Sequence, residues 1–90
     1  MEHIDFIVTI LKLKEIRKVK THSGIEHSII EGEVEDDHDH IAFAAWNEKA
    51  DLFKETKVGN RIKMLNCFIS SYKGVLQINV GRDSNVVKVD

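Results

Sequence analysis

The feature that most constrains this chain is an alternation of apolar and polar residues with a period of two, which runs through most of its length. Residues i and i+2 of a strand face the same side of a sheet, so this alternation predicts half-buried strands and not helices. The alternating runs are rich in β-branched residues, which also favours strands. The sequence therefore predicts an all-β fold.

Turn signals divide the alternation into five strands, with one helix between the third and the fourth. The turns are expected at Thr21–Gly24, Asp36–Asp39 and Lys73-Gly74. Asn47 is a candidate cap for a helix over 48–56, which places Ala50 and Phe53 on one face. The expected strands are 6–20, 25–35, 40–46, 61–72 and 75–80, with 85–89 continuing or closing the last. This order predicts a five-stranded OB-fold barrel with a short helix between strands 3 and 4.

Length and cysteine usage limit the remaining possibilities. Ninety residues are expected to form one domain over 1–90, which is either a whole protein or a piece of a longer one. Cys67 is the single cysteine, so no internal disulfide is possible and a reducing cytoplasm is expected. No signal peptide follows Met1, and the longest apolar run, Ile41–Trp46, is too short to span a membrane.

Charge is distributed unevenly along the chain. The net charge of −2 argues against a strong general affinity for nucleic acid. However, residues 12–20 carry a net +4, whereas residues 26–39 hold seven acids and no Lys or Arg. A surface polarised in this way can bind an anion on one side. We expect DNA to avoid the side formed by the acidic second strand.

Strand parity predicts which aromatic residues face outward. In the third strand Phe43 lies in the apolar phase, so Trp46 is expected to point outward. In the fourth strand Leu65, Cys67 and Ile69 form the inward set, and Phe68, Ser70 and Tyr72 fall on the outward face with Asn66. In the fifth strand Leu76, Ile78 and Val80 are expected inside, with Gln77 and Asn79 outside.

An outward aromatic set on a β-barrel is typical of a platform on which bases stack. Trp46, Phe68 and Tyr72 are the candidate stacking residues, and Gln77 and Asn79 are candidates for hydrogen bonds to base edges. Candidate phosphate contacts are Arg17, Lys18, Lys20 and Lys73. The alternative for each aromatic is a place in the core, and OB folds also serve as protein-interaction modules.

Several motifs carry a resemblance to a known family. These are Arg17 before the first-turn Gly24, the third strand and helix start 41–50, Val58-Gly59, and the runs 66–74 and 76–82. In these features the chain resembles the OB domains of archaeal replication protein A and related single-stranded-DNA-binding proteins. The resemblance covers the chain from about Ile7 onward, and its fourth-to-fifth-strand part is the most specific.

The resemblance implies binding of single-stranded DNA in replication, repair or recombination, without catalysis. It assigns base stacking to Trp46, Phe68 and Tyr72, and it assigns the family's basic positions to Arg17 and Lys73. Other OB-fold domains or replication and repair proteins are the implied partners. One departure is the segment 35–40, which lacks the Asp-x-Thr-Gly usual between the second and third strands.

No other chemistry is indicated by the sequence. Asp36–His40 contains His and carboxylate residues, but adjacent residues in a tight turn rarely converge on one ion, so no metal is expected. Cys67 lies on the inward parity and is interpreted as core. No catalytic motif or cofactor site is present, so we expect no enzyme. Two alternatives stay open: a subunit-assembly domain with little DNA binding of its own, and RNA in place of DNA.

Overall fold

The alternating segments form strands in a computed structural model that describes residues 4–89, with the side chain of Tyr72 not described. The strands are β1 (Ile4–Leu13), β2 (Arg17–Lys20), β3 (Glu26–Glu35), β4 (His40–Trp46), β5 (Arg61–Tyr72), β6 (Val75–Val80) and β7 (Asn85–Val89), and η1 (Asn47–Phe53) is a 3-10 helix. The bounds predicted for β4, β5, β6 and β7 are confirmed. No helix among the described residues is both long and apolar enough to cross a membrane.

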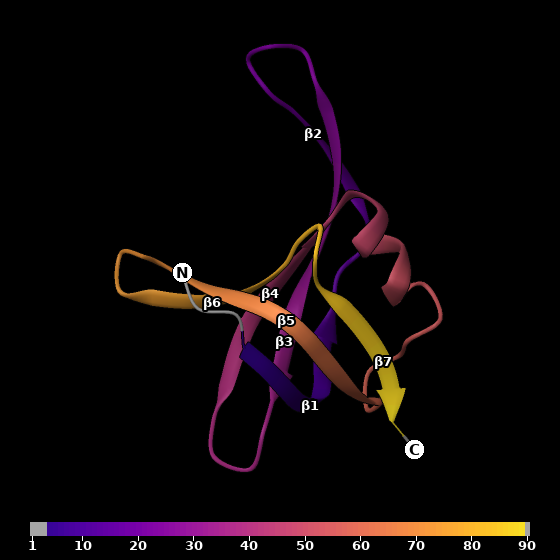
Figure 1. Cartoon of the computed structure of the whole chain (residues 1–90), viewed down its shortest axis with the longest axis vertical. Helices are drawn as coiled ribbons and strands as arrows, with labels where there is room; N and C mark the ends of the chain where they lie inside the picture. Colours follow the sequence, from indigo (N-terminus) through magenta and orange to yellow (C-terminus); the bar gives the residue numbers. More distant parts are fainter. Residues whose placement is uncertain (1–3, 90) are drawn as a thin grey trace.

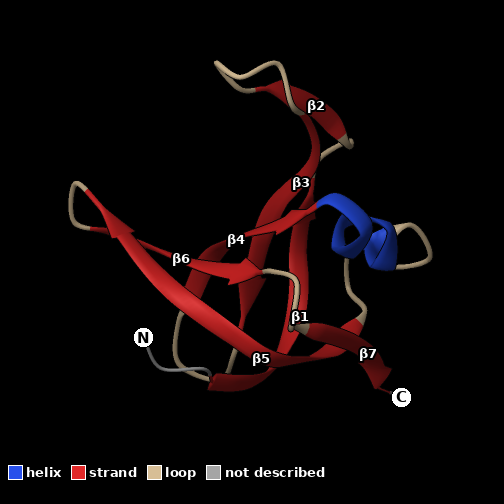
Figure 2. Ribbon diagram, turned by 45° about the horizontal axis from the view of Figure 1, so that its top comes forward, coloured by secondary structure: helices blue, strands red, loops and turns tan. Residues whose placement is uncertain are grey.

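Five of the strands close into a ring. Neighbouring strands follow the order β1-β3-β4-β6-β5, and β5 pairs with β1 to complete the circle (Figure 1). The β4–β6 pair is parallel, and the others are antiparallel. Figure 2 shows η1 following β4 at one end of the ring. This ring order and the helix position confirm the predicted fold class.

Two hairpins extend beyond the ring as arms (Figure 1). The first arm is made by β2 and the start of β3, which pair from Arg17↔Ile29 to Lys20↔Glu26. The second arm is the tip of the β5–β6 hairpin, where Lys73 and Gly74 have φ angles of 52° and 80°. Positive φ at both central residues is the two-residue turn that matches the twist of paired strands. The expected tight hairpin at Lys73-Gly74 is therefore confirmed.

The core fills the ring and is closed at one end by η1. Phe43 of β4 stacks on Phe53 of η1 with ring centroids 4.9 Å apart. Ala50 and Phe53 are both buried, as the sequence predicts, although the helix is 3-10 and not α. The fully enclosed residues of the ring include Ile10, Val34, Ile62, Met64, Cys67, Ile78 and Val80.

The prediction that Asn47 caps the helix through its side chain is wrong. Asn47 is the first residue of η1, has a φ of 55°, and makes no side-chain cap. Its Oδ1 instead accepts a hydrogen bond from the Ser28 N–H at 3.2 Å, and its Nδ2 lies 3.0 Å from Nδ1 of His27. The side chain therefore ties the start of η1 to β3.

A bulge at Asn66 changes the inward set predicted for β5. Cys67 pairs with Ile4 and Met64 with Phe6, so Leu65 and Asn66 together oppose the single residue Asp5. Asn66 has a φ of 55°, and its N–H donates to Oδ1 of Asp5 at 2.8 Å. Because one residue is inserted, both Met64 and Cys67 face the core. The prediction that Leu65 shares the inward face with Cys67 is wrong, since Leu65 is only partly buried.

Two further expectations about the strands are corrected. The single strand expected over 6–20 is interrupted at residues 14–16, after a register shift between Ile10 and Lys12. Leu76 was expected inside but is 53% exposed, because the hairpin carries it past the end of the ring.

Gly32 allows β1 to curl over the core. A Cβ built on Gly32 would collide with the carbonyl oxygen of Lys12 and would lie 2.7 Å from Cε1 of Phe43. No side chain fits between these two groups, so only glycine permits this close approach of β1, β3 and Phe43.

Candidate nucleic-acid interface

The strand registers align the outward residues of β3, β4, β6 and β5 in rows. We call this surface the outer face. Residues paired across adjacent strands lie side by side, with Cβ atoms about 4.5–5.5 Å apart. One row runs Glu31, Ala44, Asn79 and Phe68, and the next runs Glu33, Ala42, Gln77 and Ser70. Small alanines occupy the β4 position of both rows; Ala42 is partly buried, and Ala44 is buried.

Trp46 lies at the edge of the outer face where β4 ends. Its side chain is exposed, at 36%, as parity predicts. The edge of the His27 ring contacts it with centroids 6.3 Å apart and an interplanar angle of 83°. Trp46 pairs with Ile29 of β3, and Asn47 turns the chain immediately after it. The ring is therefore held at a corner but remains open to solvent.

Phe68 lies in the same row as Asn79, on β5. It is half-buried and is not part of the hydrophobic core cluster. A Cβ on Gly81 would come within 3.2 Å of Cε1 of Phe68, so the ring rests against the Gly81 backbone. The glycine thus provides the space that keeps Phe68 on the outer face.

Tyr72 is placed only by its backbone. It is the last residue of β5 and pairs with Val75. Its side chain lies outside the described residues, so its part in the stacking platform stays a prediction.

Gln77, Asn79 and Ser70 form a hydrogen-bonded network on the outer face. Nε2 of Gln77 donates to Oδ1 of Asn79 at 3.0 Å, and Nδ2 of Asn79 donates to Oγ of Ser70 at 2.8 Å. Asn79 was expected to be exposed, but it is only 6% exposed and its amide is engaged on both sides. In this arrangement Asn79 positions Gln77 and Ser70, and Gln77 is the partly exposed member.

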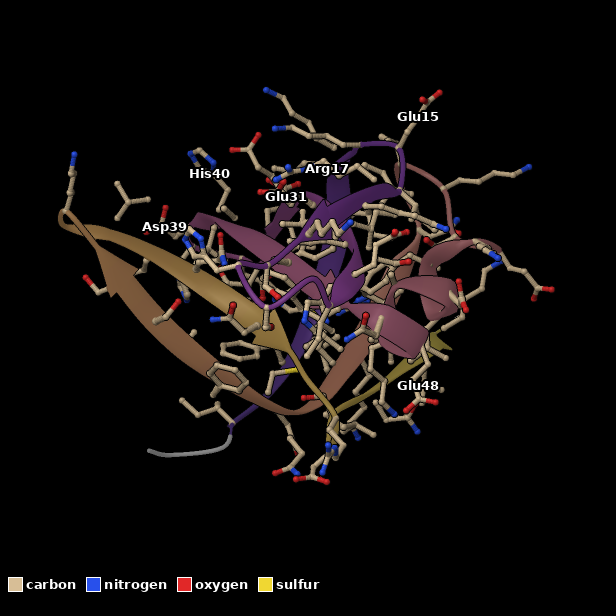
Figure 3. All side chains as sticks on the ribbon, turned by 90° about the horizontal axis from the view of Figure 1, so that it is seen from above. Glu15, Arg17, Glu31, Asp39, His40 and Glu48 are labelled. Carbon is tan, nitrogen blue, oxygen red and sulfur yellow. The ribbon has the colours of Figure 1, made fainter. Side chains whose placement is uncertain are left out.

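The basic residues beside the outer face are paired with glutamates of β3. Nη2 and Nε of Arg17 lie 2.5 and 3.1 Å from Oε1 of Glu31 (Figure 3). Nζ of Lys12 lies 3.2 Å from Glu33, and Nζ of Lys18 lies 3.3 Å from Glu26. The guanidinium of Arg17, which was predicted to contact phosphate, is therefore already engaged by a carboxylate.

The acidic strand is not remote from the aromatic residues, which corrects the expectation that it forms a separate side. Glu31 shares a row with Phe68, and Glu33 shares a row with Gln77. Both glutamates line a groove of about 270 Å³ with Lys12, Ala42 and Gln77. The signal was present in the sequence, because Glu31 and Glu33 are two residues apart and must share a face.

The remaining predicted basic residues belong to the two arms. Lys20 ends β2 on the first arm and is exposed. Lys73 is exposed in the turn of the second arm. Lys20 and Lys73 therefore lie on two different hairpins that extend beyond the ring.

Comparison with known proteins identifies the group to which this chain is related. The family model described as "Single-stranded DNA binding protein Ssb-like, OB fold" matches residues 2–88. The chain belongs to this Ssb-like OB-fold family.

Individual relatives agree with this Ssb-like assignment. The single-stranded DNA binding protein Ssb of Saccharolobus solfataricus is 27% identical over 88 residues, which cover 98% of this chain and 57% of that protein. The Ssb-like chain therefore spans little more than half of that relative's length.

Solved structures show the same fold. A replication factor A related protein from Methanobacterium thermoautotrophicum superposes with a TM-score of 0.79 at 20% identity, over 100% of this chain and 84% of that one. A chain of a replication protein A heterotrimer bound to single-stranded DNA also gives 0.79, at 12% identity, over 99% of this chain and 22% of that chain. At these identities the likeness concerns the fold alone.

The thiol and the described metal-binding side chains of this Ssb-like chain lie away from the outer face or far from one another. Cys67 is in the core, as parity predicts, and burial raises the pKa of its thiol. Within residues 4–89, no three His, Cys, Asp or Glu side chains converge in a way that could hold a metal ion. The oxygen Oδ1 of Asp36 accepts hydrogen bonds from the backbone N–H groups of His38 and Asp39. Asp36 thus stabilises the turn over 36–39, which contains no glycine.

Proposed function

We propose that the outer face binds single-stranded DNA, with bases stacked on Trp46, Phe68 and Tyr72. The observation that carries this proposal is the exposed Trp46 together with the half-buried Phe68, both outside the core cluster of a chain that belongs to a single-stranded-DNA-binding family. The β4 residues Ala42 and Ala44 add no bulky side chain to the surface between them. Stacking on an aromatic ring contributes about 1–3 kcal/mol per base and tolerates any sequence.

The phosphates are held from the two arms. Lys20 of the first arm and Lys73 of the second are the proposed contacts, and Arg17 joins them when a phosphate replaces Glu31. Gln77 supplies a hydrogen bond to a base edge while Asn79 holds its amide in place. Binding of this kind weakens as salt rises, because each neutralised phosphate releases counterions.

The role that follows is that of a binding module without catalysis. Single-stranded DNA is exposed during replication, repair and recombination. The relatives are named as single-stranded-DNA-binding or replication proteins. We propose a cytoplasmic role in these processes, in which other OB-fold domains or replication and repair proteins act as partners.

Titration of the chain with a fluorescein-labelled oligo-dT at low salt tests the proposal. Trp46 is the only tryptophan, so stacking of a base on it should quench the intrinsic emission. Trp46→Ala should weaken binding about 5- to 150-fold, the equivalent of one lost stacking contact. Phe68→Leu should also weaken binding, because it keeps the apolar volume against Gly81 and removes the ring.

Leu52→Ala is the matched control, because Leu52 lies on η1 and is 37% exposed, nearly the same as Trp46. Thermal unfolding of each variant verifies that the fold is kept. Unchanged emission and unchanged oligonucleotide anisotropy for the wild-type chain would rule out the proposed surface. Equal losses from Trp46→Ala and Leu52→Ala would rule out stacking as the mechanism.

A further inference from the structure

Strand alternation places Leu76 on the same side of β6 as the core residues that follow it, but Leu76 lies outside the core. Ile78 and Val80 are next in the same phase of β6, and both are 0% exposed. Leu76 is nevertheless 53% exposed, and its neighbour Val75 is 64% exposed. Two adjacent apolar residues are thus presented to solvent where the ring ends, and neither belongs to the predicted stacking platform.

These residues form one wall of a groove at the end of the barrel, which we call the end groove. Its volume is about 460 Å³, within the range of known binding pockets. Phe6, Val8 and Ile41 contribute the apolar lining on the other side. The end groove lies at the start of β4, whereas η1 follows the end of β4 and closes the opposite end of the core.

The polar part of the end groove is acidic. Glu33, Asp36, Asp39 and His40 line it, and the described residues of the lining include no Lys or Arg. Figure 3 shows Asp39 and His40 near each other. Glu33 is paired with Lys12, but among the described residues neither Asp36 nor Asp39 has a basic side chain within 4.0 Å. Hydrogen bonds from the N–H groups of His38 and Asp39 lower the pKa of Asp36, so its carboxylate stays ionised well into the acidic range.

We propose that the end groove binds a segment of another protein in which a bulky apolar side chain is flanked by lysines or arginines. The apolar side chain occupies the space between Leu76 and Ile41, and the flanking cations approach Asp36 and Asp39. Three carboxylates and one histidine leave the rim acidic, and an acidic rim repels a phosphate backbone, so its charge favours a cationic peptide over nucleic acid. The chain then carries two surfaces that adjoin at Glu33 and Ala42, the outer face for DNA and the end groove for a protein partner.

Three labelled peptides test the required chemistry by fluorescence anisotropy. The peptide KKLFKK carries both cations and apolar side chains, KKGSKK carries only the charge, and EELFEE carries only the apolar part. We expect saturable binding of KKLFKK alone. Equal binding of KKGSKK would overturn the proposal, because it would show general attraction to an acidic surface.

Substitutions locate the bound peptide. Leu76→Ser should weaken KKLFKK binding about tenfold or more, the loss expected for one buried leucine. Val87→Ser is the control, since Val87 is 46% exposed on β7 and does not line the groove. Asp36→Asn with Asp39→Asn should weaken it about three- to tenfold at low salt. Asparagine keeps the Oδ1 that accepts the backbone hydrogen bonds of this turn, so the turn is retained.

Glu48→Gln is the control for charge, because Glu48 is exposed on η1 and far from Asp39 in the view of Figure 3. Three results would overturn the proposal. One is equal binding to the Leu76→Ser and Val87→Ser variants. The second is loss of oligonucleotide binding in Leu76→Ser, which would assign the end groove to the DNA path. The third is a wild-type dimer in sedimentation that Leu76→Ser dissociates, which would make a second copy of this chain the occupant.

Discussion

Replacement of Glu31 by glutamine should strengthen DNA binding and make it more sensitive to salt. Glu31 holds Arg17 at 2.5 Å and also lies in the row of Phe68 on the outer face. In the wild-type chain a phosphate must displace this carboxylate before it reaches the guanidinium. Glutamine keeps the size of the side chain and removes the charge, so Arg17 becomes available to phosphate.

The size of the effect follows from the exposure of the pair. The side chains of Arg17 and Glu31 are 61% and 30% exposed, and exposed ion pairs contribute about 0.2–1 kcal/mol to stability. The free energy of unfolding should therefore change little. Removing one negative charge about 8 Å from a phosphate is worth about 0.5–2 kcal/mol at an effective dielectric of about 20–80. Affinity at low salt should rise about two- to thirtyfold.

The salt dependence separates release of Arg17 from a general change in charge. Each phosphate neutralised on a single strand adds about −0.7 to the slope of log K against log salt. A phosphate that replaces Glu31 releases a counterion from the DNA, but the freed carboxylate attracts cations again, so the wild-type slope is shallow. In Glu31→Gln the slope should steepen by about 0.7, and the two curves should converge at high salt.

Anisotropy of labelled oligo-dT over a salt series gives both the affinity and the slope. Asp51→Asn is the matched control, because it changes the net charge equally and releases Lys54, whose Nζ lies 3.2 Å from Oδ1 of Asp51 and which is in neither row of the outer face. Adding Arg17→Ala to Glu31→Gln should cancel the gain. The reasoning is refuted if Glu31→Gln and Asp51→Asn strengthen binding equally, or if Glu31→Gln weakens it.

Three further predictions concern the interior. Gly32→Ala should lower the free energy of unfolding in urea by about 3 kcal/mol or more, because the added Cβ collides with the backbone and with the Phe43 ring. Gly24→Ala is the control: its positive φ is strained but its Cβ meets no other atom, so the loss should be only about 1–2 kcal/mol. Asn79→Ala should lower the free energy of unfolding by about 1–3 kcal/mol and weaken DNA binding, because Ser70 and Gln77 lose their hydrogen-bond partner. Normal DNA binding by this variant would show that the network does not position Gln77. Cys67 should resist iodoacetamide at pH 8 until urea unfolds the chain. Its raised pKa stabilises the fold below the thiol's ordinary value of 9.0, and this contribution should disappear as pH rises through the higher folded value, so rapid alkylation of the native chain would contradict its burial.

The strands that end at strong turn signals were predictable from sequence. His40–Trp46 lies between an acidic turn and the start of η1, and Val75–Val80 follows a Lys-Gly turn, so both ends of each strand are marked. The outward position of Trp46 followed from the buried phase of Phe43. Local chemistry determines these features, and a single sequence contains that chemistry.

Other features depend on how the ring closes. The break after Leu13 coincides with an interruption of the alternation at Lys14 and Glu15, but two adjacent polar residues do not by themselves show that a strand ends. Leu76 has the phase of Ile78, but phase does not say where the ring ends. The pairing of Arg17 with Glu31 joins residues 14 apart, and it depends on the register of an arm that no sequence pattern states.

The extra residue at Asn66 changes which residues of β5 face the core. Upstream of it, the even-numbered Ile62 and Met64 are internal; downstream, the odd-numbered Cys67 and Ile69 take that place. Deletion of Asn66 would therefore restore plain alternation, because Leu65 alone would oppose Asp5, and Cys67 would stay inside while Phe68 and Ser70 stay outside. The loss of Asn66 would instead remove the local bend and twist that a bulge gives to its strand, and so alter the angle at which Phe68 is presented without changing any residue proposed to touch DNA.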